Sequence, residues 1–499
     1  LKLLPQCQSM AVKPALLDIP EPAHPLVPFS TYKSCADLVT HSEVFDLPVP
    51  ALTPVQAPFG AARGGLPISF VESEAYCRSN NLLLVSGETF ACFGQAGLFI
   101  LAPGVNRQRL FSQVTDQPVL SAVAEASSDD RGTAMVAYTT ADGSLALLLI
   151  EASTGKVLRS AAGSIPGADD ARLWLSSMRV RELPDETGNV GNAEAGVLAY
   201  RLRMQDSSSR RPTVELMAVR LTYQEERLAS EIISAWHGPA LPRASSWSNS
   251  TVLVVSSASF TPLTMPACDS KDATDSNRED ASNMGFQGCY DVEDEAAIVT
   301  VLPLTSNDAD CSMEGEPAQE ALTRSWALPR GKLLAACNAG AGGVTLLVES
   351  GVDALSCRLL LTGGVAGTPS VQSPPQCISG LASLARARQN LRFCLCSHSS
   401  TFCGLFEAAG SNAATVFRNP AGAAVAPTFS VPLGYEEEVL GAHLFEDTVQ
   451  VLTPTRILRF ALDASVRCSS GGPSLQLGAK LPGGIDAAAL LRMLDAAED

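Results

Sequence analysis

Hydrophobic and polar residues alternate in short runs along most of this chain, and the runs come in groups. The alternation is clearest from Val214 to Leu221 and is typical of a strand with one buried face. Asp-Gly and Thr-Gly pairs, as in 141–144 and 153–156, join neighbouring runs and favour hairpin turns. The first two groups of predicted strands are 82–86, 90–93 and 98–101, then 119–126, 134–139, 145–150 and 157–160.

Similar groups continue toward the C-terminal end, and almost no helical periodicity separates them. Six or seven antiparallel meanders, each of about 40 to 60 residues, favour sheets arranged around an axis, because this arrangement covers the sheet edges. A pair of β-sandwiches is the alternative that also gives many short strands. We therefore expect an all-β fold, an irregular β-propeller of about seven four-stranded antiparallel blades. It is irregular because no Trp-Asp or Gly-His repeat signature is present.

One helix is expected, near the C-terminal end. From Ile485 to Ala497 the leucines lie on one side, and Asp486 is a candidate N-cap. The predicted organisation is an N-terminal extended segment (1–35), a first propeller part (36–267), an acidic mobile loop (268–295), a second propeller part (296–466), and a loose tail with the short helix (467–499).

The acidic loop has a composition unlike the rest of the chain. From Cys268 to Glu295 it holds nine acidic and two basic residues, with few apolar ones. Such a segment buries too little apolar surface to offset the entropy lost on ordering. We expect it to be mobile.

Charge and hydropathy exclude several partner classes. The net charge of −17 argues against nucleic acid, whose binding depends on neutralising phosphates with Lys and Arg. No apolar run approaches the roughly 18 residues that span a bilayer, and the N-terminal residues lack the apolar core of a secretory signal. The expectation is a cytoplasmic protein, with the nucleus left open as a second location. Its 14 cysteines are then expected to be reduced and mostly buried.

Three cysteines and a histidine cluster in the stretch "RFCLCSHSSTFCGLF" (392–406). Zinc sites typically use paired Cys-x2-4-Cys knuckles, whereas Cys394 and Cys396 are two apart and share one face of a strand. The residues "SHSST" supply a turn, and Cys403 falls on the returning strand. A strand hairpin is favoured over a metal site formed with His398.

The other candidate motifs are also better explained as structural features than as catalytic or ligand-binding sites. Asp269, Asp272 and Asp275 have a spacing of three, and Lys271 stands at a ligand position, so they do not form an EF-hand loop. No Gly-x-Ser-x-Gly elbow or P-loop occurs. The histidines have no compelling partner nearby in sequence; they are His24, His41, His237, His398 and His443. We therefore predict no catalytic, cofactor-binding or metal-binding residue, and no cofactor.

Several segments, read in order, resemble the NudC domain-containing protein 1 family. They are "VKPALLDIPEPAHPL" (12–26), "PTVELMAVRL" to "VVSSASF" (212–260), "GCYDVEDEAAIVTV" (288–301), "GVDALSCRLLL" (351–361), and "EEEVLGAHLF" to "RILRFAL" (436–462). The resemblance spans most of 12–462 and depends on the order of short motifs. It implies a β-propeller with an inserted CS domain, and co-chaperone work with heat-shock protein 90 or propeller-containing clients.

The chain departs from that family pattern at the expected insertion. Fewer than 30 mainly acidic residues lie between Phe260 and Cys289, whereas a CS sandwich needs roughly 90 to 100 residues for its core. Either the domain was lost in this lineage, or an exon is missing from the gene sequence. Because the family is not enzymatic, no residue is carried over as catalytic.

These observations lead to one expected function and two rivals. We expect a non-enzymatic scaffold or co-chaperone-like adaptor that binds other proteins. A structural subunit of a large assembly is the alternative. A propeller-type hydrolase is the alternative from another class, and it would need His, Asp or Glu side chains that converge at the inner strands.

Overall fold

The structure is a computed structural model, and every regular element in its described residues is a β-strand. The expectation of an all-β fold is confirmed. The expected C-terminal helix, the acidic loop and the tail lie outside the described residues. The structure describes residues 15–16, 29–31, 39–49, 52–53, 80–86, 88–103, 109–126, 132–166, 173–182, 193–204, 212–224, 227–247, 251–263, 296–304, 323–338, 343–351, 353–361, 369–371, 376–378, 392–398, 401–407, 413–419, 426–433, 437, 439–445 and 448–462.

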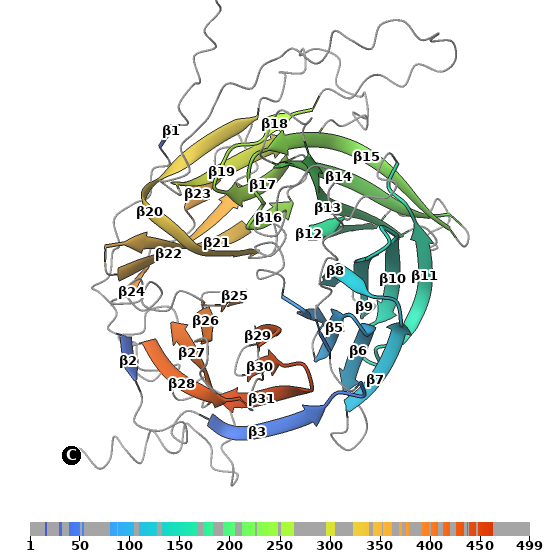
Figure 1. Cartoon of the computed structure of the whole chain (residues 1–499), viewed down its shortest axis with the longest axis vertical. Coiled ribbons are helices and arrows are strands. Elements are labelled where there is room, and N and C mark those ends of the chain that lie inside the picture. The colour runs from blue at the N-terminus through green and yellow to red at the C-terminus, as the bar shows by residue number, and fades with distance from the viewer. Residues whose placement is uncertain are drawn as a thin grey trace, which may run out of the picture.

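Blades 1 to 3 are antiparallel sheets in which the chain runs from the innermost strand outward (Figure 1). Blade 1 comprises β4 (Leu82–Ser86), β5 (Thr89–Gly94), β6 (Gly97–Pro103) and β7 (Arg109–Thr115). Blade 2 comprises β8 (Val119–Ala126), β9 (Thr133–Thr140), β10 (Leu145–Glu151) and β11 (Val157–Gly163). Blade 3 comprises β12 (Trp174–Glu182), β13 (Ala193–Met204), β14 (Pro212–Gln224) and β15 (Arg227–Gly238), with β18 (Thr261–Pro262) added at its edge.

Blades 4 and 5 share one long strand, β20 (Arg324–Asn338), which pairs with blade 4 through its first part and blade 5 through its second. Blade 4 adds β16 (Ala244–Trp247), β17 (Thr251–Ser256) and β19 (Ala296–Pro303); blade 5 adds β21 (Gly343–Ser350), β22 (Asp353–Leu361), β23 (Pro369–Val371) and β24 (Gln376–Ile378). Blade 6 comprises β25 (Arg392–His398), β26 (Thr401–Glu407), β27 (Ala413–Asn419) and β28 (Ala426–Pro432). Blade 7 comprises β29 (Gly441–Phe445), β30 (Thr448–Leu452), β31 (Arg456–Leu462) and β3 (Val39–Asp46).

The innermost strands form a closed ring. Each innermost strand contacts the next in the order β4, β8, β12, β16, β20, β25 and β29, and β29 contacts β4. Figure 1 shows these blades arranged around one axis. This ring confirms the β-propeller prediction over the pair of β-sandwiches.

In blades 1 and 2, side chains in the middle of the blade are buried on both faces, because each of these blades packs between two others. In β5, Phe90 and Cys92 pack into the core shared with blade 7, whereas Ala91 and Phe93 pack into the core shared with blade 2. Gly97 turns the chain into β6 with φ of 112°. A Cβ there would collide with the Thr115 carbonyl oxygen, so this turn requires glycine.

The ring closes through a strand from near the start of the chain. β3 pairs antiparallel with β31 and so supplies the outer strand of blade 7. Arg459 on β31 forms ion pairs with Glu43 of β3 and Glu88 of blade 1, each at 3.2 Å. The closure therefore joins residues more than 400 positions apart, and no sequence pattern predicted it.

Short extended segments add to several outer edges. β1 (Ala15–Leu16) pairs parallel with β20, and β2 (Phe29–Thr31) pairs parallel with β28. β18 pairs with β15, and one parallel bridge joins β11 to β15. β7 is the outer strand of blade 1, and no such pairing involves it among the described residues.

Candidate functional site

The cysteine stretch forms the expected hairpin. β25 and β26 pair antiparallel, with Cys396 opposite Cys403 and Cys394 opposite Leu405. The backbone register places Cys394 and Cys396 on the same face, as the sequence predicted. Their side chains are outside the described set, so the choice against a metal stays a prediction.

The other sequence candidates are dispersed or outside the described residues. The aspartates 269, 272 and 275, His24 and the terminal helix are outside them. The other histidines lie on four strands of three blades: His41 on β3, His237 on β15, His398 on β25 and His443 on β29. Within the described ranges, no helix is long and apolar enough to cross a membrane, and no group of three His, Cys, Asp or Glu could hold a metal ion.

A row of polar side chains, partly buried, crosses blade 3, and sequence reasoning missed it. Arg201 on β13 lies opposite Glu215 on β14, and Glu215 lies opposite His237 on β15. Arg201 donates through Nε and Nη2 to the two carboxylate oxygens, at 3.0 and 3.2 Å. His237 Nε2 and the Thr261 hydroxyl of β18 are 3.1 Å apart. Only the pairing of long strands brings these residues together.

This row has some of the groups of a nucleophile, base and acid triad, but a different electrostatic arrangement. A triad carboxylate orients the histidine and stabilises its charged form. Here Glu215 binds Arg201 in a bidentate ion pair, which neutralises its charge. Burial lowers the pKa of His237, and Glu215 raises it by less. The geometry therefore favours a structural role, holding β13, β14, β15 and β18 together.

Polar side chains also connect the innermost strands of blades 2 and 3. Ser121 Oγ of β8 accepts the Leu175 N–H of β12 at 2.7 Å. Further along the same strand, Glu125 Oε2 accepts the Val180 N–H at 3.0 Å. Burial raises the Glu125 pKa to about 7, although the Val180 hydrogen bond and Arg179 act against it. This carboxyl therefore changes charge near neutral pH.

The junction between blades 7 and 1 uses an amide side chain instead. Asn80 donates from Nδ2 to the Ala442 carbonyl at 2.9 Å, and its Oδ1 accepts the Ala442 N–H at 3.1 Å. Asn80 Oδ1 also accepts the Leu82 N–H at 3.2 Å. The amide thus connects β29 to the start of β4, where the ring closes.

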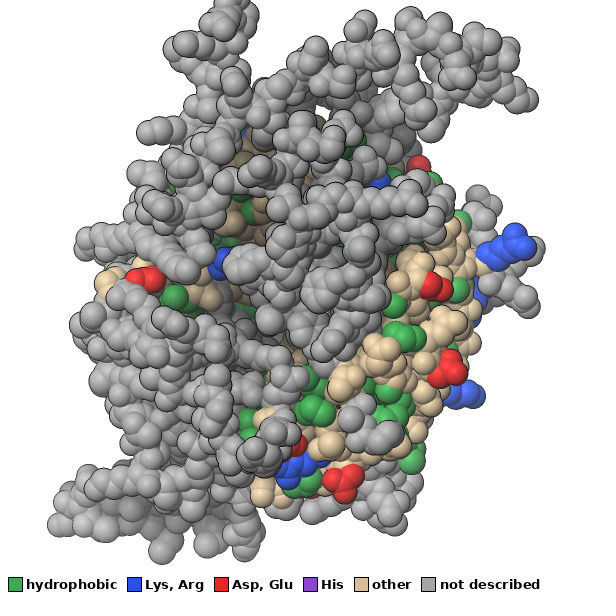
Figure 2. Space-filling view, viewed as in Figure 1, with side chains coloured by type: hydrophobic (Ala, Val, Ile, Leu, Met, Phe, Trp, Pro, Cys, Tyr) green, Lys and Arg blue, Asp and Glu red, His purple; other side chains and the backbone are tan. Residues whose placement is uncertain are grey.

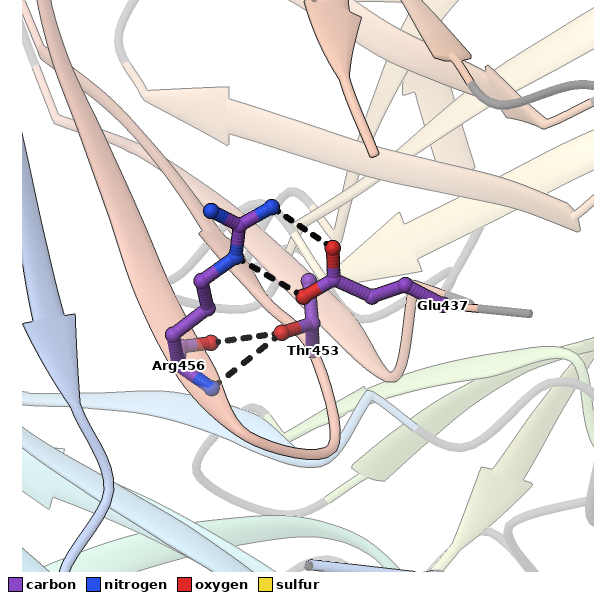
Figure 3. A network of polar contacts seen from close by, with 3 residues as sticks. All are labelled: Glu437, Thr453 and Arg456. Carbon is purple, nitrogen blue, oxygen red and sulfur yellow. Dashed lines mark hydrogen bonds and ion pairs between the residues drawn. The ribbon is translucent and has the colours of Figure 1, made fainter. Parts of the chain in front are cut away.

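A bidentate ion pair fixes the β30–β31 turn, as Figure 3 shows. Arg456 donates from Nε and Nη2 to the carboxylate of Glu437, at 2.9 and 2.7 Å. The Thr453 hydroxyl donates to the Arg456 carbonyl and accepts its N–H. Glu437 precedes β29, so the network joins this connection to the turn. Its groups are engaged in holding blade 7 together.

Two thiols are buried and unreactive by their surroundings. Burial raises the pKa of Cys92 and of Cys357 to about 12. A thiol must ionise to act as a nucleophile or to bind a metal. Both therefore behave as small hydrophobic residues, whereas Cys337 is only partly buried.

The outer strand of blade 1 is unusual for an exposed edge. β7 begins with Arg109, and we call the six residues after it, 110–115, the β7 rim; this stretch contains no charged residue and no proline. Leu110 is 56% exposed, and Ser112 and Gln113 are exposed as well. Exposed edges usually carry charges or proline, which discourage pairing with another strand. The lower right of Figure 2 shows hydrophobic and uncharged atoms on this side of the molecule, with acidic and basic side chains among them.

Comparison with known proteins supplies no family. No protein-family model matches the chain, and no curated protein does. Similar solved structures include the WD40 domain of SCAP from fission yeast, at 9% identity and a TM-score of 0.36, over 78% of this chain and 96% of that one. The Dos1 propeller has 9% identity and a TM-score of 0.31, over 75% of each chain. The β-propeller domain of the Trilobed protease from Pyrococcus furiosus has 8% identity and a TM-score of 0.33, over 77% and 95%.

Proposed function

We propose that this protein is a non-enzymatic scaffold that binds other proteins at its outer edge. The observation that carries the proposal is the β7 rim, an uncharged stretch of an edge strand that includes an exposed leucine. An edge strand presents backbone N–H and C=O groups that a further strand can pair with. The partner would be a protein with an extended, uncharged segment that contains apolar residues.

The chain itself covers comparable edges in this way. β1, β2 and β18 are short extended segments without charged residues, and each adds to the outer edge of a sheet. The β7 rim has the same character and no such segment among the described residues. Leu110 would supply apolar contact beside the new backbone hydrogen bonds, since burial of a leucine side chain contributes about 1.5 to 3 kcal/mol.

The resemblance to the NudC domain-containing protein 1 family extends this proposal to a co-chaperone-like adaptor. On that basis the partners are the heat-shock protein 90 system or propeller-containing clients, in the cytoplasm or nucleus. The acidic segment 268–295 would add attraction toward a basic partner surface. Deleting this segment tests the attraction, and unchanged partner binding would remove it from the proposal.

A pull-down from the source cells with two matched variants tests the rim. Leu110→Lys places a charge on the β7 rim, whereas Leu158→Lys places one on β11, where the leucine is 47% exposed and the edge already bridges to β15. We expect Leu110→Lys to reduce recovery of rim partners about tenfold or more, and Leu158→Lys to leave it unchanged. Equal recovery with both variants, each with wild-type thermal stability, would overturn the proposal.

A further inference from the structure

We propose that Glu125 makes the junction between blades 2 and 3 a proton-responsive clasp, which is tightest when its carboxyl is protonated. At the inner end of this junction, beside its apolar core, two side chains cross from β8 to β12. Ser121 binds the Leu175 N–H, and Glu125 binds the Val180 N–H. The serine acceptor is neutral, whereas the glutamate acceptor changes charge with pH.

The serine end of the junction is part of a neutral network. Ser121 Oγ lies 3.2 Å from the Thr139 hydroxyl, which donates to the Leu173 carbonyl at 2.7 Å. Ser121 and Thr139 are both buried. Nothing in this network titrates in the physiological range, so it holds the two blades together equally at all such pH values.

The glutamate end is different because its acceptor is ionisable and half-buried. Opposite Glu125 on β9 is Met135, a buried residue that belongs to the core between the two blades. Removing a carboxylate from water costs free energy unless a counter-charge or several hydrogen bonds compensate. Here burial outweighs the Val180 N–H and Arg179, and the pKa rises to about 7.

Among the described residues, few charged groups surround Glu125. Arg179 on β12 is the charged group that acts on it, and its effect is smaller than that of burial. β4 carries no ionisable side chain. The ionisable residues on the other strands that contact β8 are Cys92 on β5, Tyr138 on β9, and Arg179, Arg181 and Glu182 on β12.

The sign of the effect follows from linkage. A glutamate carboxyl in water has an ordinary pKa of 4.5, and the pKa of Glu125 in the closed junction is about 7. Opening the junction therefore favours the ionised form, and the closed state loses stability as pH rises from 4.5 through 7. Between pH 6 and pH 8 the opening equilibrium should increase about tenfold. The ring is thus most rigid at this junction on the acid side of neutrality.

Hydrogen exchange of the whole chain, corrected for the intrinsic effect of pH, tests the clasp. We expect the amides of 174–182 to lose about tenfold in protection between pH 6 and pH 8, while those of 251–256 in β17 stay unchanged. Glu125→Gln keeps an oxygen acceptor for Val180 without the charge and should abolish the difference. Ser121→Ala should lower protection at both pH values and leave the difference intact.

Two results would overturn the proposal. One is equal protection of 174–182 at the two pH values in the wild-type chain. The other is a pH difference that persists in Glu125→Gln, since that would place the titrating group elsewhere. If Glu125→Gln unfolds part of the ring, carbon NMR of the wild-type chain can follow the titration of the Glu125 carboxyl instead. A titration midpoint near pH 4.5 would refute the clasp.

Discussion

The buried ion pair of blade 3 gives a sharp test of how this blade is held together. Arg201 and Glu215 have only 7% and 6% of their side chains exposed. Replacing Arg201 with Met leaves the Glu215 carboxylate buried without its cation. Breaking a buried pair in this way costs about 3 to 5 kcal/mol, so we expect a fall of that size in the free energy of unfolding at pH 8.

The double variant Arg201→Met with Glu215→Leu should behave very differently. It buries no charge, and the two apolar side chains fill a similar volume. Buried pairs replaced by apolar residues are often neutral or stabilising, so we expect stability within about 1 kcal/mol of the wild type or above it. The coupling free energy between the two sites should therefore be about 3 kcal/mol or more.

His237 adds a pH signature with a defined sign. In the wild type, burial lowers the pKa of His237, so its contribution to stability is present above pH 6.5 and is lost as pH falls. In Arg201→Met, Glu215 is no longer neutralised and should raise the pKa of His237. The single variant should then be less destabilised at pH 5.5 than at pH 8.

Urea unfolding at both pH values provides the measurement. Trp174 and Trp236 lie on blade 3 and are buried, so their fluorescence reports on this blade. Glu231→Gln is the control, because Glu231 is 61% exposed in its pair with Arg220 and should cost less than about 1 kcal/mol. A single Arg201 variant as stable as this control, or a double variant as unstable as the single one, would refute the reasoning.

Two further predictions concern ring closure and the thiols. A methyl group at Gly441 would collide with Asn80 and lie 2.7 Å from the Leu82 nitrogen, so Gly441→Ala should lower the free energy of unfolding by about 2 to 4 kcal/mol. The control is Gly351→Asn, which places the side chain in open space and should cost less than about 1 kcal/mol. Thermal unfolding that ranks the two variants equally would contradict this prediction. Cys92 and Cys357 should resist alkylation by iodoacetamide at pH 8 until the protein unfolds, because a thiol with a pKa of about 12 is ionised in about one molecule in ten thousand. Mass spectrometry that finds either residue modified in the folded protein within minutes would show that its burial is not maintained.

Much of the strand pattern was predictable, and the omissions have clear causes. The predicted strands 82–86 and 119–126 coincide with β4 and β8. β7 was not predicted because its sequence "RLFSQVT" mixes polar residues with few apolar ones. An outer strand needs less burial than the strands inside a blade, so its hydrophobic signal is weak.

The candidate sites show the same limit. Sequence spacing correctly placed Cys394 and Cys396 on one face of a hairpin, because hairpin register is a local property. It could not bring Glu125 to Val180 or Arg201 to Glu215, since those contacts depend on how separate strands pair and pack. Their local sequences look like ordinary strand positions with a charged residue.

The class of fold could be predicted from local sequence alone. Alternating apolar residues and hairpin turns are local features, and together they specify antiparallel meanders too short to bury their own faces. The way the ring closes, with β3 completing blade 7 beside β31, depends on contacts between distant parts of the chain. The same is true of the buried polar groups, because burial at a blade junction depends on the neighbouring blade. The charge of Glu125 near neutral pH is a consequence of that packing.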